Sequence, residues 1–188
     1  MKRVLLRLFV IVGLVGDTTN HAISAAITTS PITTSWLSNI STRVLVQTGD
    51  NVMIGGFIVQ GTQSKRVIIR ALGPELTPFG VTDPLADPTL ELHDVNGALI
   101  ASNDNWVRTI IGGIITSNQV ADIRDSGYAP ADPRESAIIA DLPPRNYTAI
   151  VRGVNATTGV ALVEADDRAI GTNSILENIS TRLCADGR

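Results

Sequence analysis

The sequence predicts an all-β protein, an antiparallel β-sandwich or jelly roll of about eight strands with one short helical insertion. Runs rich in Val, Ile, Leu and Thr recur along the 188 residues, and Gly, Pro, Asn and Asp separate them. Two of the connections carry the residues of tight turns. A single cysteine permits no internal disulfide, so the fold must depend on its core, and the chain is long enough to bury one.

The N-terminal segment has the features of an export signal. Basic residues precede and interrupt an apolar run at residues 5–15, and small residues follow it. The run is shorter than the roughly 20 residues that span a bilayer, so we interpret residues 1–26 as a signal peptide, with an uncleaved anchor as the alternative. Residues 27–35, mostly Thr, Ser and Ile, read as a linker. We therefore expect a secreted or cell-surface protein with no membrane span after cleavage.

Eight later segments have the composition of strands and together define a module at residues 36–167. In order they are RVLV at 43–46, MIGGFIV at 53–59, RVIIRAL at 66–72, TLELH at 89–93, ALIAS at 98–102, ESAIIADL at 135–142, YTAIVRG at 147–153 and GVALVEA at 159–165.

Two connections predict hairpins. Asp94 begins a polar turn that ends in Gly97, which can adopt positive φ, so TLELH should pair with ALIAS. Residues 155–159, NATTG, should join the last two segments in the same manner. Pro143 and Pro144 stand just before a strand begins, where their missing N–H groups break no ladder.

One segment departs from the strand pattern. TIIGGIIT at residues 109–116 is apolar around two glycines, and residues 118–125 then predict a short helix. The segment is either a structural loop folded over one end of the sandwich or a mobile flap over a binding site.

A repeated heptapeptide marks the two ends of the module. LSNISTR at residues 37–43 returns as LENISTR at residues 176–182. Repetition at a fixed spacing is typical of chains built from copies of one unit. We therefore expect residues 168–188 to be the start of a second, truncated repeat.

Charge and histidine content exclude several functions. The chain has 15 basic and 18 acidic residues, and its basic residues do not cluster, which argues against nucleic acid as a partner. His93 is the only histidine beyond the signal peptide, too few for the histidine-rich zinc hydrolases. The G-x-S-x-G turn of a serine nucleophile is absent from the sequence.

A cluster of acidic and amide side chains suggests calcium. If TLELH and ALIAS pair, the residues after ALIAS emerge beside Asp87, with Asp83 close in sequence. Ca²⁺ takes six to eight oxygen ligands, and carboxylates and amides supply them. The predicted metal ligands are Asp83, Asp87, Asn103, Asp104 and Asn105. The alternative is that these residues end strands and bond their own backbone.

A hydrolase is the second reading of the same region. Glu91 and His93 share one face of a strand, and together with Asp104 they are the candidate proton acceptors beside a calcium ion that polarises an ester or lactone. The alternative is a structural histidine in a sheet. Arg70 and Arg152 more simply form structural ion pairs. The tryptophans, Trp36 and Trp106, are either core residues or platforms for a sugar ring.

Several strings resemble a module repeated in large secreted bacterial proteins. They are NISTR, GDNVMIGGFIV, IRALGPEL, LADPTLELHDVNGALIASNDNW, ESAIIADLPP and YTAIVRGVNATTGVALVEADD, which cover residues 36–167 and resume at 176. The pattern is also similar to bacterial pre-peptidase C-terminal-like sandwiches. The resemblance implies a non-catalytic β-sandwich repeat and carries no catalytic residue. The chain departs from it at Arg145 and Asn146, at the inserted TIIGGIIT and in the shortened second repeat.

Two functions therefore remain open at this stage. The first is a non-catalytic extracellular module for adhesion, spacing or glycan binding, whose partner is a glycan or another cell-surface component. The second is a calcium-dependent secreted hydrolase of small esters or lactones.

Overall fold

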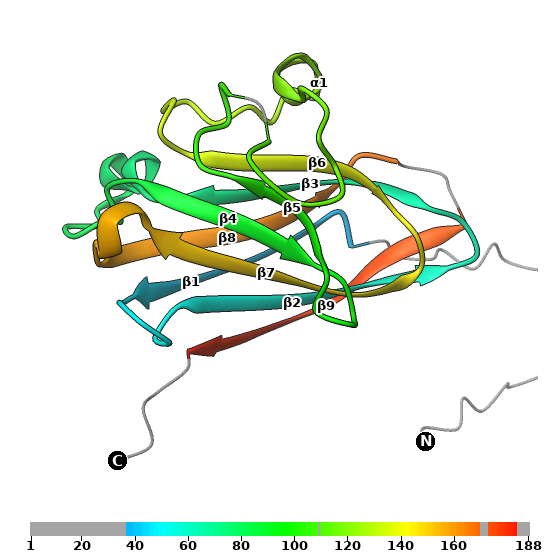
Figure 1. Cartoon of the computed structure of the whole chain (residues 1–188), viewed down its shortest axis with the longest axis horizontal. Coiled ribbons are helices and arrows are strands. Elements are labelled where there is room, and N and C mark those ends of the chain that lie inside the picture. The colour runs from blue at the N-terminus through cyan, green and yellow to red at the C-terminus, as the bar shows by residue number, and fades with distance from the viewer. Residues whose placement is uncertain (1–36, 109, 170–172, 184–188) are drawn as a thin grey trace, which may run out of the picture. The chain divides into compact units, whose positions relative to one another are not determined.

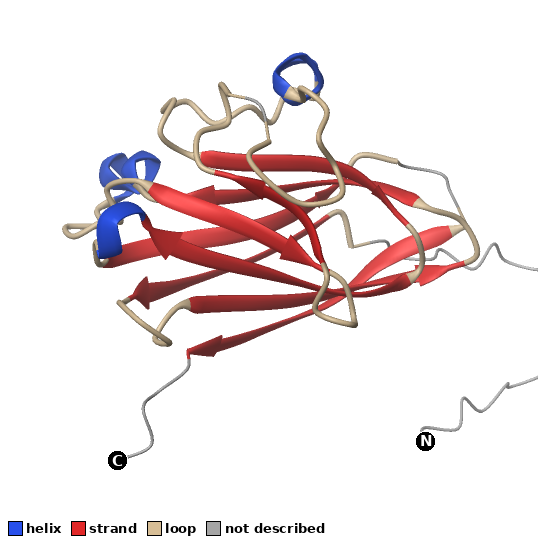
Figure 2. Cartoon of the chain, viewed as in Figure 1, coloured by secondary structure: helices blue, strands red, loops and turns tan. Residues whose placement is uncertain are grey.

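The computed structural model describes residues 37–108, 110–169 and 173–183. The predicted signal peptide and linker lie outside the described residues, as do Trp36 and Cys184. The described residues form two antiparallel sheets and little helix (Figures 1 and 2), which confirms the predicted all-β sandwich. No helix among them is long and apolar enough to cross a membrane.

Nine strands make up the two sheets of the described part. In spatial order, the four-stranded sheet contains β1 (Asn39–Val46), β8 (Gly159–Asp167), β3 (Lys65–Leu72) and β6 (Ser136–Leu142). The five-stranded sheet contains β5 (Leu99–Asn103), β4 (Pro88–His93), β7 (Arg145–Gly153), β2 (Met53–Gly61) and β9 (Ser174–Leu183). Helical turns occur at η1 (Pro74–Phe79), α1 (Val120–Asp125) and η2 (Val154–Ala156). The eight predicted segments are all strands, β1 to β8.

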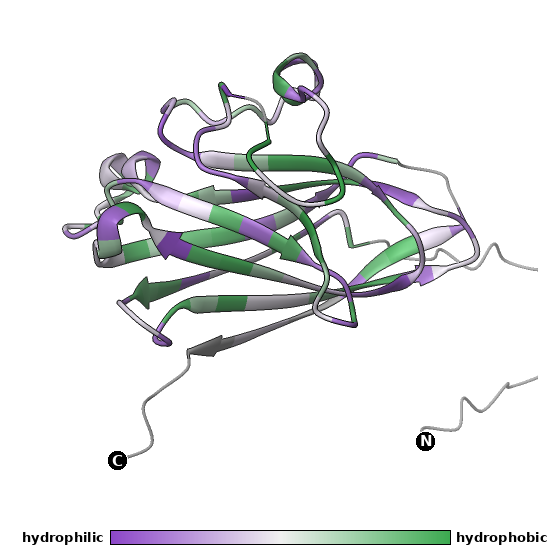
Figure 3. Cartoon of the chain, in the orientation of Figure 1, coloured by the Kyte–Doolittle hydropathy of each residue, from purple (hydrophilic) through white to green (hydrophobic). Residues whose placement is uncertain are grey.

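The core lies between the sheets because alternate residues of the inner strands are apolar (Figure 3). Val67, Ile69 and Ala71 of β3 face the same core as Leu90 and Leu92 of β4, and all five side chains are fully buried. Burial of one such Val, Ile or Leu side chain stabilises the fold by about 1.5–3 kcal/mol. This shared core is what holds the two sheets together.

The hairpin predicted between β4 and β5 is confirmed. One carboxylate oxygen of Asp94 accepts the N–H groups of Asn96 and Ala98, and Gly97 has a φ of 77°. Glu91 stands opposite Ser102 in the resulting ladder. The turn therefore has the polar first residue and the left-handed glycine that the sequence indicated.

The second predicted hairpin is wrong, because β7 and β8 belong to different sheets. The connection crosses from one sheet to the other through η2, where Asn155 has a φ of 54°. Leu85, fully buried, fills the space beside this crossing. A Cβ on Gly159 would lie 2.6 Å from the Leu85 backbone nitrogen, so glycine is required there for this contact rather than for a tight turn.

The inserted segment covers an edge of the sandwich rather than one end, and the helix that follows it covers a face. The segment extends the five-stranded sheet beyond β5, where Ser102 donates its N–H to the Gly112 carbonyl and Ile115 donates to Ile100, both at 2.8 Å. The predicted helix is confirmed as α1, which lies beside β6 (Figure 1). There Ile123 packs against the outward-facing Ile68 and forms a small second core. Apolar residues on the outer face of a sheet need such a cover.

Both copies of the heptapeptide lie in edge strands of the same sandwich. The first copy forms most of β1, which pairs with β8, and the second lies in β9, which pairs with β2. A buried lysine attaches the start of β9: the Lys65 Nζ atom lies 2.7 Å from an Asp167 carboxylate oxygen and 2.6 Å from the Ser174 carbonyl oxygen. The interpretation of residues 168–188 as the start of a second repeat remains a prediction.

Candidate functional site

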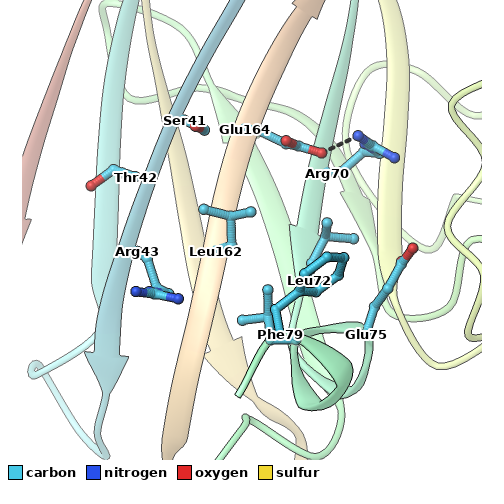
Figure 4. A pocket seen from close by; sticks show the side chains of 10 residues that line it. Ser41, Thr42, Arg43, Arg70, Leu72, Glu75, Phe79, Leu162 and Glu164 are labelled. Atoms are coloured by element: carbon cyan, nitrogen blue, oxygen red, sulfur yellow. Dashed lines mark ion pairs between the residues drawn. The ribbon is translucent and has the colours of Figure 1, made fainter. Parts of the chain in front are cut away.

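The outer face of the four-stranded sheet is only partly covered. α1 and its flanking loops lie over β6 and part of β3, whereas β1 and β8 stay open and form a hollow of about 600 Å³ against η1 (Figure 4). We call this hollow the η1 groove. Its lining residues are Ser41, Thr42 and Arg43 of β1, Leu162 and Glu164 of β8, Arg70 and Leu72 of β3, and Glu75, Leu76 and Phe79 of η1.

A rigid helical turn presents an aromatic side chain to the groove. η1 begins with Pro74 and ends at Gly80, whose φ of 82° stops the turn. Leu76 is buried beneath it, while Phe79 is 78% exposed. The whole turn stands close to the sandwich, because a Cβ on Gly73 would lie 2.0 Å from a backbone oxygen. The backbone position of Phe79 is thus set by the residues on both sides of the turn.

A buried carboxylate fixes the first turn of η1. The two oxygens of Glu135, a fully buried residue, accept the N–H groups of Gly73 and Glu75 at 2.8 Å each. Burial raises the pKa of the Glu135 carboxyl to about 7, even though both N–H groups favour the ionised form. The first N–H groups of a helical turn have no partner within the turn itself. Here their partner is Glu135, the residue immediately before β6.

An ion pair forms part of the groove floor. Arg70 of β3 pairs with Glu164 of β8, and it also donates to the Tyr128 carbonyl oxygen at 3.0 Å. Burial raises the pKa of Glu164, and the positive charge of Arg70 only partly offsets that effect. The guanidinium groups of Arg70 and Arg168 each lie over the Tyr128 ring, at 5.3 and 4.1 Å from its centre. The predicted structural pairing of Arg70 is confirmed.

The opposite wall of the groove carries groups available to a ligand. Arg43 forms no ion pair or side-chain hydrogen bond with any residue that the structure describes, and it lies on the opposite side of the groove from Phe79 and Glu75 (Figure 4). Ser41 is exposed beside it. The groove therefore combines leucine side chains and an aromatic ring with hydroxyl, guanidinium and carboxylate groups, as ligand sites on proteins commonly do.

The predicted pair Glu91 and His93 does come together, but as part of a sheet surface. The His93 Nε2 atom lies 3.0 Å from a Glu91 carboxylate oxygen, and Arg152 of β7 donates to the same oxygen at 3.0 Å. The other ring nitrogen lies 3.1 Å from the Gly97 carbonyl oxygen. Partial burial opposes ionisation of Glu91, but the contacts with His93 and Arg152 outweigh it and lower its pKa. The predicted structural pairing of Arg152 is thus confirmed, but its partner is Glu91 and not Glu135, Asp141 or Glu164, which the sequence suggested.

Asp104 lies away from that pair. Leu90 is the partner of Asn103 in the ladder, so Asp104 follows β5 at the end opposite the hairpin turn. There it approaches Asp87: burial, then the negative charge of Asp104, raises the pKa of the Asp87 carboxyl. Each carboxylate has one buried oxygen without a hydrogen-bond partner among the described residues. The predicted catalytic residues Glu91, His93 and Asp104 therefore do not form one site.

The other predicted metal ligands have structural roles or lie apart. The Asn103 side chain accepts from the Ala137 N–H and donates to the Asn105 carbonyl oxygen, both at 3.2 Å. Asp83 accepts the Val160 N–H at its backbone oxygen, and its side chain is exposed. No group of three or more His, Cys, Asp or Glu side chains suited to a metal occurs in the described ranges. Two carboxylates, Asp87 and Asp104, are what the structure brings together.

Sequence reasoning missed the η1 groove. The signal that could have revealed it is the string LTPFG, which places an aromatic residue between a proline and a glycine. An aromatic residue in such a connection need not be buried. Trp106, the predicted alternative platform, instead packs on the second core and donates its indole N–H to the Asp132 carbonyl oxygen at 3.1 Å. No protein-family model matches the chain, and the search of curated proteins gives no significant match.

Proposed function

We propose that the chain is a non-catalytic, secreted β-sandwich module that binds an extracellular glycan in the η1 groove. The observation that carries the proposal is the exposed Phe79 ring, which lies beside a hollow lined by both apolar and polar side chains. Sugar rings offer C–H faces that stack on aromatic rings, and hydroxyls that bond to polar side chains. Adhesion and spacing on the cell surface are the roles that such binding serves.

The structural roles of charged residues outside the η1 groove support a binding role for the residues that line it. Lys65 fastens β9, Glu135 fastens η1, and Glu91 with His93 and Arg152 stabilises neighbouring strands. Buried and half-buried charges in a sandwich need such partners for the fold itself. Arg43 and Phe79, in contrast, have no role in the core, and both line the groove.

The test is a glycan array followed by calorimetric titration of the best ligand. We expect Phe79→Ala to weaken binding at least tenfold, about 1.4 kcal/mol, because the stacking surface is lost. Ile114→Ala is the matched control, since Ile114 is 75% exposed but does not line the groove. Unchanged affinity of the Phe79 variant, or no glycan bound by the native chain, would contradict the proposal.

A second candidate is the calcium-dependent hydrolase of small esters or lactones. The pair Asp87 and Asp104 favours it, because two neighbouring carboxylates with unpartnered buried oxygens suit a cation. We expect Ca²⁺ to raise the melting temperature of the native chain and not that of Asp104→Asn. Hydrolysis of an ester and lactone panel should then be abolished by EDTA. A melting temperature indifferent to Ca²⁺ and EDTA would dismiss this candidate.

A further inference from the structure

The two copies of the heptapeptide occupy different structural positions. In β1 the copy pairs with β8, with Asn39 opposite Asp166 and Arg43 opposite Leu162. In β9 it pairs instead with β2, with Ile179 opposite Phe57 and Arg182 opposite Ile54. The sequences of β8 and β2, GVALVEADD and MIGGFIVQG, have little in common. Pairing with β2 alone therefore does not explain why β9 repeats the sequence of β1.

The second edge of β9 supplies the missing explanation. Every strand has two hydrogen-bonding edges, and β9 uses only one of them for a described strand, since it stands last in the five-stranded sheet. β1 lies close to part of β9 but forms no ladder with it. An edge of β9 without a ladder is a template for a further strand. We infer that β9 is a shared strand, whose open edge pairs with β8 of a second copy of this module that follows it in tandem.

One residue of β9 is left out of its pairing with β2. The register shifts between Phe57 and Ile58, whose partners are Ile179 and Glu177, so Asn178 has no partner position in β2. Its counterpart in the first copy, Asn39, donates to a carboxylate oxygen of Asp166 at 2.5 Å. In the register of β1 on β8, Asn178 stands opposite Asp166 of the second copy. Asn178, which has no partner position in β2, is thus the counterpart of Asn39, which bonds to Asp166 when β1 pairs with β8.

A shared strand has a mechanical consequence. The five-stranded sheet of one module continues through β9 into the β8, β3 and β6 strands of the next, and hydrogen bonds cross the junction. Modules joined in this way form a stiff rod rather than a series of domains connected by flexible linkers. This geometry suits a spacer on a cell surface, and it does not depend on glycan binding in the η1 groove.

The test is a tandem chain in which the second heptapeptide serves both modules. Residues 1–182 are followed directly by residues 44–188, so that the second copy has no β1 of its own. The control is the full chain followed by residues 37–188, which gives the second copy its own heptapeptide. Hydrogen exchange of the amides at residues 174–183 and protease resistance of the second copy are measured in both, and in the native chain.

We expect the second copy of the shared-strand chain to fold and resist protease. The β9 amides that exchange quickly in the native chain should slow at least tenfold in the shared-strand chain, and should stay fast in the control. An unfolded second copy in the shared-strand chain, beside a folded control, would overturn the inference. Unchanged exchange of β9 in the shared-strand chain would overturn it as well.

Discussion

Replacement of Lys65 by methionine should be among the most damaging single changes in the protein. The Lys65 side chain is 0% exposed, and its Nζ atom lies 2.7 Å from an Asp167 oxygen, 2.6 Å from the Ser174 carbonyl oxygen and 3.2 Å from that of Ala169. Methionine is unbranched and apolar like the lysine stem, so the variant fills most of the space. What it removes is the charge that faces Asp167, a side chain only 4% exposed.

The expected loss follows from the burial of the pair. Removal of one partner of a buried ion pair leaves an uncompensated charge and costs about 3–5 kcal/mol. For a unit of roughly 150 residues this corresponds to a fall in melting temperature of about 6–20 °C. Denaturant unfolding followed by tryptophan fluorescence measures the free-energy loss, and thermal unfolding followed by far-ultraviolet circular dichroism measures the melting temperature. The double variant Lys65→Met with Asp167→Leu should recover much of the loss, because no buried charge then remains unpaired.

An exposed ion pair on the same strand provides the control. Arg66 contacts Asp122 at 2.8 Å and Asp141 at 2.9 Å, but its side chain is 38% exposed. Arg66→Met should therefore cost at most about 1 kcal/mol. Equal losses for the Lys65 and Arg66 variants would refute the reasoning, and so would a double variant less stable than Lys65→Met alone.

Two further perturbations test the groove wall and the inserted segment. The raised pKa of Glu135 means that the folded state holds its proton more tightly than the unfolded state, so this contribution to stability is complete below about pH 4.5 and is lost as the pH rises through about 7. The loss of stability amounts to at most about 3 kcal/mol. Glu135→Gln should abolish this pH dependence when the free energy of unfolding is measured between about pH 4 and 8. The same pH dependence in both proteins would contradict the assignment. Gly113→Ala should cost at least about 1 kcal/mol in denaturant unfolding, because Gly113 has a φ of 103° and a Cβ there would lie 2.5 Å from the Ile100 carbonyl oxygen. Gly112→Ala is the control and should cost less, because its new Cβ would meet its nearest atom at 3.7 Å, an ordinary contact distance. Equal losses of stability in the two variants would contradict the described path of the segment.

The strands and the first hairpin were predictable because their causes are local. Alternation of apolar residues defines β2, β3 and β7 within each segment, and the Asp94 turn needs only its own four residues and the one that follows. The face shared by Glu91 and His93 follows from the same period of two. Features of this kind do not require knowledge of the sheet order.

The site was not predictable because it is assembled from distant parts of the chain. The η1 groove needs β1, β8 and β3 side by side, and η1 is held by Glu135, which lies about 60 residues later in the sequence. The crossing between β7 and β8 likewise depends on Leu85, which no property of residues 153–159 indicates. The acidic pair Asp87 and Asp104 was found because the confirmed hairpin fixes which strand ends meet.

The inserted segment itself bears on the choice between the two proposed functions. A lid over a hydrolase site must open, and opening of this segment together with α1, which follows it, would expose Ile123, which is 1% exposed, and the outward-facing Ile68 and Ile139 of the sheet beneath α1. At about 1.5–3 kcal/mol for each side chain, and with the hydrogen bonds to β5 lost as well, opening would consume much of the 5–15 kcal/mol that stabilises an ordinary domain. The segment is therefore better suited to a fixed cover than to a lid. Because that cover ends at Tyr128, beside Arg70, it also sets one boundary of the open groove, which favours a preformed binding surface over a gated active site.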